Sequence, residues 1–401
     1  MAESPVPVLW LCGPAGVGKS TVSWQLFEEL AQAGVRVAFA DTDQLCMCYP
    51  APPGDQGRER LKAQNIGAMI RNYQAAGAQC LVVNGVLDPV AGLYSGLMPA
   101  GDVMVCRLRA SMDEVMRRFT ERHGQGQDLD GLLQQIRDEV TGMDQSSFCD
   151  ACVDTTGVPA AEVAGLVRAV CGQWPGFRAG FAGCAGHDTV QGPAAASIGA
   201  GAGGQVVLIC GPTGVGKSTI GFELYMRCLQ AGLTAGYIDL GQLGFLRPAG
   251  GDAVDHRLRA RNLAAMWRNY HAAGATHLIA TGPIENASAL RIYAAELPDA
   301  TMTVCVLSAG NDELTRRILS RGSGGSWSEP GDPLRGQPAQ MLRKLAAVAA
   351  GQAAELGRAH PDWLVVDTDG RSPAEAAGLI GSAVGLRPSR RQRGRTAAKP
   401  E

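Results

Sequence analysis

The sequence predicts an α/β protein of two tandem domains, each a parallel β-sheet of about five strands covered by helices. Three observations predict this class. A glycine-rich motif follows a short apolar run at two places, apolar runs alternate with helical stretches, and the motifs of the first half return in order in the second. Such alternation is typical of parallel sheets with helical crossovers. A chain of 401 residues with 46% hydrophobic content can supply two domain cores.

The first half alternates strand and helix along its length. Its predicted strands are apolar runs without strict alternation, which is typical of strands buried on both faces. They are Val6 to Cys12, Val35 to Ala40, Gln79 to Val83, Val103 to Leu108 and Cys152 to Asp154. The predicted helices are Lys19 to Gln32, Gln56 to Ala76, Met112 to Arg122, Leu129 to Met143 and Pro159 to Val170. We expect ligands beyond the carboxyl ends of these strands.

The glycine-rich motif is a phosphate-binding loop, or P-loop, because each copy stands between a predicted strand and a predicted helix. Glycines accept the positive φ angles of the loop, and the amides that open the helix point at phosphates. The copies are Gly13, Pro14, Ala15, Gly16, Val17, Gly18, Lys19, Ser20 and Thr21, and Gly211, Pro212, Thr213, Gly214, Val215, Gly216, Lys217, Ser218 and Thr219.

Each copy predicts a site for ATP with Mg²⁺. Lys19 and Lys217 are expected to reach the β- and γ-phosphates, and the hydroxyls of Ser20 and Ser218 are expected to ligate the metal. The motif leaves the choice between ATP and GTP open.

The second half repeats the first at an offset of 198 residues. That offset relates the two P-loops and carries Asp41 to Asp43 onto Asp239 to Gly241; one residue less carries Arg71 to Tyr73 onto Arg268 to Tyr270. We therefore predict a tandem duplication. Its parts are a first domain over 1–171, a Gly- and Ala-rich linker over 172–204, a second domain over 205–386 and a basic disordered tail over 387–401.

Charge and cysteine usage bound the setting of the protein. The formal net charge is −2, so no global field favours nucleic acid or a membrane, although the basic tail leaves a nucleic-acid role open. Without a membrane-spanning apolar run or a positive region at the start, we expect a cytoplasmic protein. The twelve cysteines are expected to be buried thiols. The alternative is a four-thiolate zinc site made of two close pairs, Cys46 with Cys48 and Cys149 with Cys152.

These motifs resemble a family of small-molecule kinases, the group of shikimate kinase, gluconate kinase and chloramphenicol phosphotransferase. The resemblance is carried by the P-loops, by Asp41 to Asp43, by Thr281-Gly282 after the third strand of the second half, and by the helix Asp113 to Arg118 with Arg122 one turn on. It covers most of each half. It implies a P-loop NTPase fold of the adenylate/shikimate-kinase type, ATP as the phosphate donor and a small molecule as the acceptor.

The resemblance also implies roles for individual residues. The carboxylates of Asp41 and Asp239 would help hold magnesium through water, and Asp43 would contact the acceptor. Arginines would line the nucleotide site and begin a lid: Arg118 and Arg122 in the first half, Arg317 and Arg321 in the second. The segments that begin at Asp154 and Asp367 would flank the adenine.

Departures from the family leave two function classes open. Asn84 and Thr281 stand where an acidic residue often follows the third strand, and the glycine triplet of shikimate kinase is absent. The first class is an ATP-dependent kinase with one or both domains active. The first domain is the better candidate for catalysis, because Asp43 in the first half corresponds to Gly241 in the second. The second is a nucleotide-binding regulatory or scaffold protein. Neither the acceptor nor the oligomeric state follows from the sequence.

Overall fold

The computed structural model describes residues 6–99, 102–123, 129–172, 174–175, 203–248, 255–284, 286–324, 332–359 and 363–386. The chain divides into two compact units. Unit 1 comprises Met1–Cys46, Asp55–Ala196 and Phe245–Val254, and unit 2 comprises Met47–Gly54, Ser197–Gly244 and Asp255–Glu401. The predicted tail, and the predicted linker apart from residues 172, 174–175 and 203–204, lie outside the described residues.

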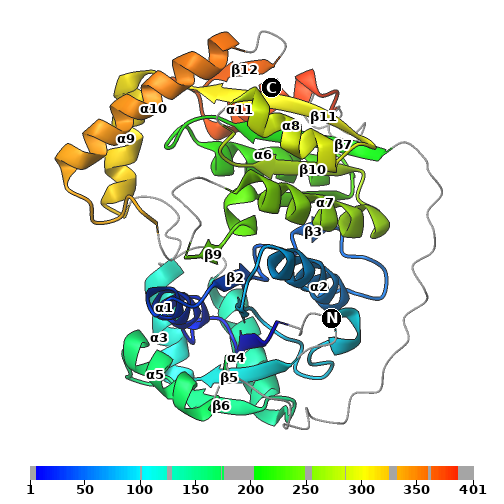
Figure 1. Cartoon of the computed structure of the whole chain (residues 1–401), viewed down its shortest axis with the longest axis vertical. Helices are drawn as coiled ribbons and strands as arrows, with labels where there is room; N and C mark the ends of the chain where they lie inside the picture. The colour runs from blue at the N-terminus through cyan, green and yellow to red at the C-terminus, as the bar shows by residue number, and fades with distance from the viewer. Residues whose placement is uncertain are drawn as a thin grey trace, which may run out of the picture. The chain divides into compact units, whose positions relative to one another are not determined.

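Unit 1 is built on a six-stranded sheet in the order β6-β5-β1-β4-β2-β9 (Figure 1). Five strands are parallel, and β9 runs antiparallel to β2 at the edge. Strand β1 lies inside the sheet and all its residues are buried, which accounts for its continuous apolar sequence. The bounds are β1 (Val8–Cys12), β2 (Val37–Asp41), β4 (Cys80–Asn84), β5 (Val103–Arg109), β6 (Ala151–Asp154) and β9 (Leu246–Arg247).

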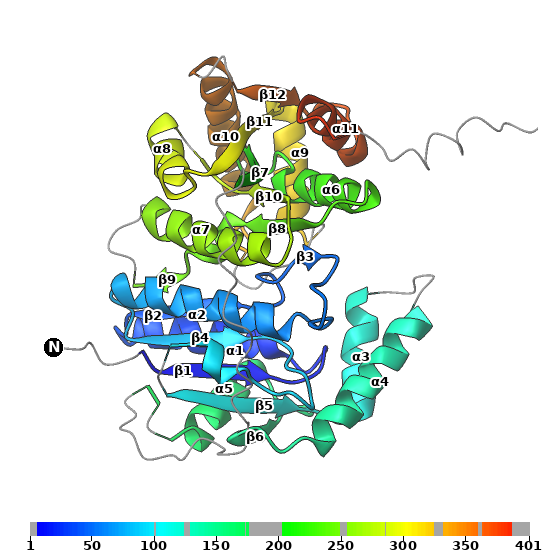
Figure 2. The ribbon, with the colours of Figure 1, turned by 90° about the vertical axis from the view of Figure 1, so that its right-hand side faces the viewer.

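Five α-helices and one 3-10 helix of the described chain complete unit 1. They are α1 (Lys19–Gln32), α2 (Glu59–Ala75), η1 (Ser95–Leu97), α3 (Met112–His123), α4 (Leu129–Gln145) and α5 (Ala160–Val170). Leu9 and Leu11 of β1 share one core with the apolar faces of α1 and α5. Helices α3 and α4 lie side by side (Figure 2).

Unit 2 has the same strand order, β12-β11-β7-β10-β8-β3. Its strands are β3 (Cys48–Tyr49), β7 (Gly203–Cys210), β8 (Ala235–Asp239), β10 (His277–Thr281), β11 (Ala300–Ser308) and β12 (Leu364–Asp367). Its helices are α6 (Lys217–Gln230), η2 (Leu240–Leu243), α7 (His256–Ala272), α8 (Ala287–Glu296), α9 (Asn311–Gly322), α10 (Ala339–Ala359) and α11 (Pro373–Ala383). Side chains cap several of them; Asp255 accepts from the Leu258 amide at 3.0 Å at the start of α7.

Each unit takes its sixth, antiparallel strand from the part of the chain that otherwise builds the other unit. In unit 1 the Phe39 amide donates to the Phe245 carbonyl at 3.0 Å, and in unit 2 the Tyr237 amide donates to the Met47 carbonyl at 2.8 Å. The two exchanged segments stand 198 positions apart, so they are matching parts of the repeat. The sequence predicted parallel sheets of about five strands and contiguous domains, and it did not predict this exchange.

The predicted strands and helices of the first half are present, with ends displaced by at most three residues. The largest displacement has a local cause. The helix predicted from Gln56 begins at Glu59, because the Asp55 carboxylate accepts hydrogen bonds from the Arg60 and Leu61 amides. Arg58, immediately before this helix, has a left-handed φ of 59°.

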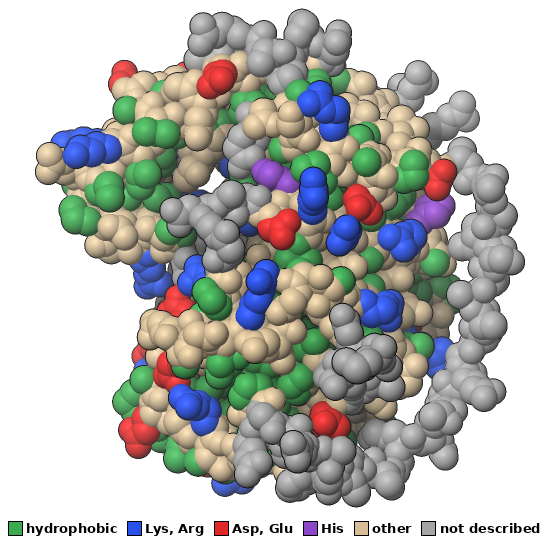
Figure 3. All heavy atoms as spheres, in the orientation of Figure 1, with side chains coloured by type: hydrophobic (Ala, Val, Ile, Leu, Met, Phe, Trp, Pro, Cys, Tyr) green, Lys and Arg blue, Asp and Glu red, His purple; other side chains and the backbone are tan. Residues whose placement is uncertain are grey.

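Two further properties of the described chain are the hydropathy of its helices and the distribution of its surface charges. No helix in the described part of the chain is long and apolar enough to cross a membrane. Figure 3 shows one face, on which acidic and basic side chains are scattered over the surface.

Candidate functional site

Both P-loops have the backbone of a phosphate cradle. The φ angles of Gly13, Gly16 and Gly18 are +141°, +87° and +95°, and those of the matching glycines in unit 2 are +140°, +84° and +100°. A Cβ at Gly13 would lie 2.3 Å from the Leu108 carbonyl oxygen, so this position has no room for a side chain. Glycine is therefore required in the loop both by conformation and by space.

The loop lysines point back over their own loops. Lys19 Nζ donates to the Pro14 carbonyl at 3.0 Å, and Lys217 Nζ donates to the Pro212 carbonyl at 2.8 Å. In unit 1 the Ala15 amide donates to a carboxylate oxygen of Glu139, from α4, at 3.4 Å. A loop amide thus faces a negative charge, which fits a site for phosphate oxygens.

In unit 1 a carboxylate lies beside the P-loop at the end of β2. Asp41 Oδ1 accepts from the Asp43 amide at 3.0 Å. The amide of Asn84, assigned from its hydrogen bonds, donates to both Asp41 oxygens at 3.2 Å, and its oxygen accepts from Ser20 Oγ at 3.2 Å. Burial, and then the charge of Asp43, raise the pKa of Asp41 to about 6.

Unit 2 repeats this arrangement at the end of β8. Asp239 Oδ2 accepts from Ser218 Oγ at 2.9 Å and from Thr281 Oγ1 at 3.1 Å. Asp239 Oδ1 accepts from the Gly241 amide at 2.8 Å. In each unit a serine hydroxyl and a carboxylate therefore lie close together at the start of the helix that follows the P-loop. Asn84 connects them in unit 1, and a direct hydrogen bond connects them in unit 2. Hard oxygen ligands of this kind suit Mg²⁺.

Two of the arginines predicted to line the nucleotide site, Arg118 and Arg317, contact the P-loop of their unit. Arg118 Nη1 lies 3.4 Å from the Val17 carbonyl and donates to Thr155 Oγ1 at 3.1 Å, and its Nη2 donates to the Thr155 carbonyl at 2.8 Å. Its Nε donates to Glu114, whose pKa is lowered to about 2 by hydrogen bonds from Arg117 and Arg118. The guanidinium thus joins α3, the P-loop and the segment after β6.

Arg317 makes the same contacts in unit 2. It donates to the Val215 carbonyl at 3.0 Å, to Thr368 Oγ1 at 2.9 Å, to the Thr368 carbonyl at 3.0 Å and to Glu313 at 2.7 Å. The buried threonines Thr155 and Thr368 belong to the segments that were expected to flank the adenine, and each directly follows a predicted site aspartate. Their position one residue after a strand was the available signal.

The other predicted nucleotide-site residues are less closely connected to the loops. Asp154 accepts from Arg109 Nε at 3.2 Å and from the Thr156 amide at 2.9 Å, and Asp367 accepts from the Asp369 amide at 3.1 Å. Arg321 pairs with the nearly buried Asp332 at 2.7 Å. The side chain of Arg122 lies outside the described residues. Thr21 and Thr219, which close the two loop motifs, are exposed.

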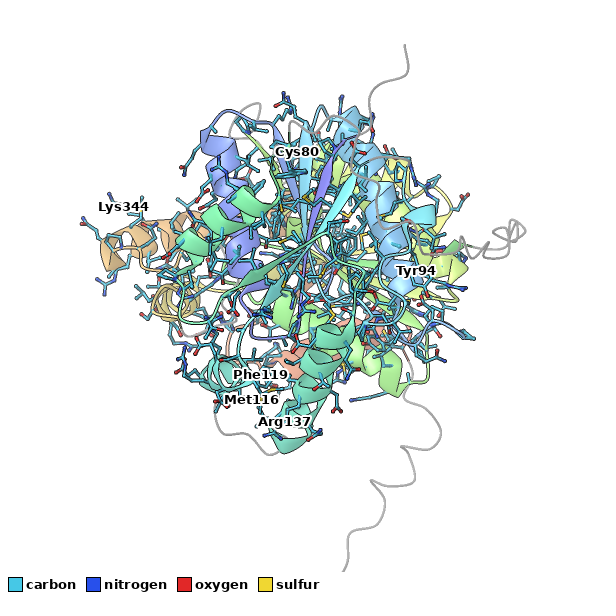
Figure 4. The ribbon with its side chains drawn as sticks, turned by 90° about the horizontal axis from the view of Figure 1, so that it is seen from below. Cys80, Tyr94, Met116, Phe119, Arg137 and Lys344 are labelled. Carbon is cyan, nitrogen blue, oxygen red and sulfur yellow. The ribbon has the colours of Figure 1, made fainter. Side chains whose placement is uncertain are left out.

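Helix α3 stands at the carboxyl ends of the strands. In Figure 4, Cys80 at the amino end of β4 and Phe119 on α3 lie at opposite ends of unit 1, with Met116 near Phe119. A Cβ at Gly16 would meet Val115 and Phe119, so α3 packs against the P-loop. The predicted motifs of unit 1 therefore gather at one end of its sheet.

Two further groups of side chains lie at the start of α2: the Glu59–Lys62 ion pair, and Arg60 with Tyr94. The buried ammonium of Lys62 donates to Glu59 at 2.6 Å and to the Val86 carbonyl at 3.3 Å, and burial raises the pKa of Glu59. The guanidinium carbon of Arg60, near the start of α2, lies 5.6 Å from the centroid of the Tyr94 ring. Sequence reasoning passed over the Glu59–Lys62 pair, because charged residues three apart on a helix are usually exposed.

The close cysteine pairs do not assemble into a common group. Among the residues that the structure describes, no three His, Cys, Asp or Glu side chains are arranged to hold a metal ion. Cys46 and Cys48 are buried, whereas Cys152 is exposed. Burial raises the pKa of the Cys46 thiol to about 11, so this group is a neutral thiol at physiological pH.

A P-loop, a carboxylate after the second strand and an arginine helix against the loop define a P-loop kinase-like domain. The comparisons agree: residues 8–139 match the family model described as AAA domain. No curated protein sequence matches the chain. The prediction of a P-loop, kinase-like nucleotide-binding domain is confirmed over the matched residues.

Solved structures similar to the chain include three named proteins. The Deinococcus radiodurans tunicamycin resistance protein is 17% identical, with 46% of this chain and 98% of that chain covered and a TM-score of 0.32. A shikimate kinase from Bacteroides thetaiotaomicron is 15% identical, with 45% and 98% covered and a TM-score of 0.31. A gluconokinase from Sinorhizobium meliloti 1021 is 13% identical, with 46% and 97% covered and a TM-score of 0.29.

Proposed function

We propose that the protein is a Mg-ATP-dependent phosphotransferase of a small hydroxylated molecule, and that unit 1 performs the transfer. The observation that carries this proposal is the pair of carboxylates at the end of β2. Asp41 and Asp43 are close enough that the charge of Asp43 raises the pKa of Asp41. Unit 2 has Gly241 in place of Asp43 and keeps only Asp239.

The residues of unit 1 divide the work of phosphoryl transfer. The P-loop amides and Lys19 bind and orient the phosphates, and Ser20 with Asp41 would hold magnesium, which neutralises phosphate charge when bound. Asp43 is exposed two residues after Asp41, where it can orient an acceptor hydroxyl and take its proton. Help of this kind is typically worth about a hundredfold or more in rate.

The acceptor side of unit 1 supports a polar, hydroxylated acceptor. The Glu59–Lys62 ion pair lies next to the segment after β4. The charge of Asp43 is among the causes that raise the pKa of Lys62. A paired carboxylate and ammonium offer both a hydrogen-bond acceptor and hydrogen-bond donors to hydroxyl groups. The side chains of this region thus favour hydrogen bonding over apolar packing.

A second candidate function applies to unit 2. Its P-loop, Ser218 and Asp239 repeat the nucleotide site, but Gly241 has no side chain to orient an acceptor. This favours unit 2 as a nucleotide-binding partner with no transfer of its own. The full chain would then combine an enzyme with a nucleotide-dependent regulatory unit.

The test is ADP formation by the full chain against a panel of small hydroxylated molecules. We expect one acceptor class to raise ADP formation, and we expect Lys19→Ala to abolish that increase while Lys217→Ala retains it. ADP formation that no acceptor changes would contradict the proposal and favour a nucleotide-binding regulatory protein. Circular dichroism of both variants controls for folding.

A further inference from the structure

The residues that end β4 and β10 have an unexplained identity. Asn84 and Thr281 stand where a P-loop protein often carries an acid for the metal, and both are almost fully buried. An uncharged residue at this place could be read as the loss of a metal ligand. The contacts of the two side chains indicate a different role.

In both units this side chain donates to the neighbouring carboxylate. Asn84 donates to the two oxygens of Asp41 at 3.2 Å, and Thr281 Oγ1 donates to Asp239 Oδ2 at 3.1 Å. In both units a backbone amide two residues after the aspartate donates to its Oδ1. Different residue types therefore perform the same hydrogen bonding in two sites of one chain.

The same network also orients the P-loop serine. In unit 1 the Ser20 hydroxyl donates to the Asn84 oxygen at 3.2 Å, and in unit 2 the Ser218 hydroxyl donates to Asp239 at 2.9 Å. When the hydroxyl hydrogen is directed at these oxygens, the lone pairs of the serine face elsewhere and remain available to a cation. Without the Asn84 or Thr281 donor, each carboxylate would be held less firmly, with its Oδ1 bonded to the backbone amide.

We infer that Asn84 and Thr281 are positioning residues for a magnesium site. Their side chains fix Asp41 and Asp239 by hydrogen bonds and add no second charge at the strand end. This inference rests on the proposed use of Mg-ATP. Outer partners of this kind are typically worth roughly ten- to a hundredfold in metal affinity. A single carboxylate at each strand end also makes metal binding depend on the nucleotide phosphates, which supply the remaining oxygen ligands.

The inference is tested on the full chain by equilibrium binding of Mn²⁺ at saturating ADP, measured by electron paramagnetic resonance. Unit 2 is isolated by Lys19→Ala, and in that background Thr281→Val removes the hydroxyl at nearly constant volume, whereas Thr281→Ser keeps it. We expect Thr281→Val to weaken Mn²⁺ binding roughly ten- to a hundredfold and Thr281→Ser to retain it. In the Lys217→Ala background, Asn84→Ala is expected to weaken Mn²⁺ binding in unit 1 by a similar factor.

Binding of ADP in the presence of a chelator separates positioning from collapse of the site. The inference requires this metal-free affinity to stay at the parent value in Thr281→Val and Asn84→Ala. Unchanged Mn²⁺ affinity, or an equal loss of metal-free ADP binding, would overturn it. No acceptor enters these measurements, so a protein that shows the expected pattern and transfers phosphate to nothing contradicts only the proposed function.

Discussion

Removing the ring of Phe245 should destabilise unit 1, although this residue lies more than 200 positions after the aromatic side chains that it packs against. The ring packs against Trp24, Phe27 and Phe39 at centroid distances of 5.2, 6.4 and 5.7 Å. Truncation of a buried phenylalanine costs about 3–5 kcal/mol. Because Phe245 is only partly buried, we expect Phe245→Ala to lower the stability of unit 1 by about 2–3 kcal/mol.

Amide hydrogen exchange read by mass spectrometry localises this loss. A cost of about 2–3 kcal/mol corresponds to roughly 30- to 150-fold faster exchange in peptides that open with the unit. The increase should appear in α1 and β2, which contact the segment. The matched control is Phe222→Ala, which removes a half-exposed ring that packs on Tyr225 and Tyr237 in unit 2. Parent-like exchange throughout α1 and β2 in Phe245→Ala would refute the reasoning.

Three further predictions concern nucleotide binding. In the Lys217→Ala background, metal-dependent ADP affinity should fall as the pH drops through about 6. The reason is that protonated Asp41 would no longer accept hydrogen bonds from metal-bound water. Asp43→Asn should move this fall to lower pH, because the charge of Asp43 raises the pKa of Asp41. Fluorescent ADP titrated between about pH 5 and 8 measures both, and a common midpoint would contradict the assigned cause. Arg118→Lys should weaken ADP binding about tenfold in calorimetry, because an ammonium cannot contact Thr155 with two donors and also reach the Val17 carbonyl of the P-loop. Parent affinity would contradict this. Glu139→Gln should tighten ATP binding several-fold, since it removes a charge from a P-loop amide, and weaker binding would count against that reading.

Local chemistry made much of the fold predictable. Strand β1 reads as a continuous apolar run because it is buried on both faces, and the helix over Lys19–Gln32 was predicted with the bounds that the structure shows. The P-loop is predictable because its glycines are required by conformation at fixed positions. The positions of Asp41 and Asp239 follow from the rule that parallel strands end at one edge.

What the sequence did not reveal depends on contacts between distant segments. Nothing local to Leu246 and Arg247 indicates that they pair with β2, since a two-residue strand has no periodicity to detect. The arginine at position 118 was expected to face the nucleotide, but its acceptors on Val17 and Thr155 are known only once the segments are brought together. The donor role of Asn84 likewise depends on an amide orientation that only its neighbours define.

The central claim is that unit 1 transfers phosphate and that Asp43 assists the acceptor. The most direct measurement is acceptor-dependent ADP formation in a single turnover by full-length Asp43→Asn and Asp239→Asn, each checked for ADP binding. The account predicts that Asp43→Asn slows transfer by about a hundredfold or more with ADP affinity retained, and that Asp239→Asn leaves the transfer rate at unit 1 near the parent value. Parent-rate transfer by Asp43→Asn, together with its loss in Asp239→Asn, would contradict the account and assign the chemistry to unit 2.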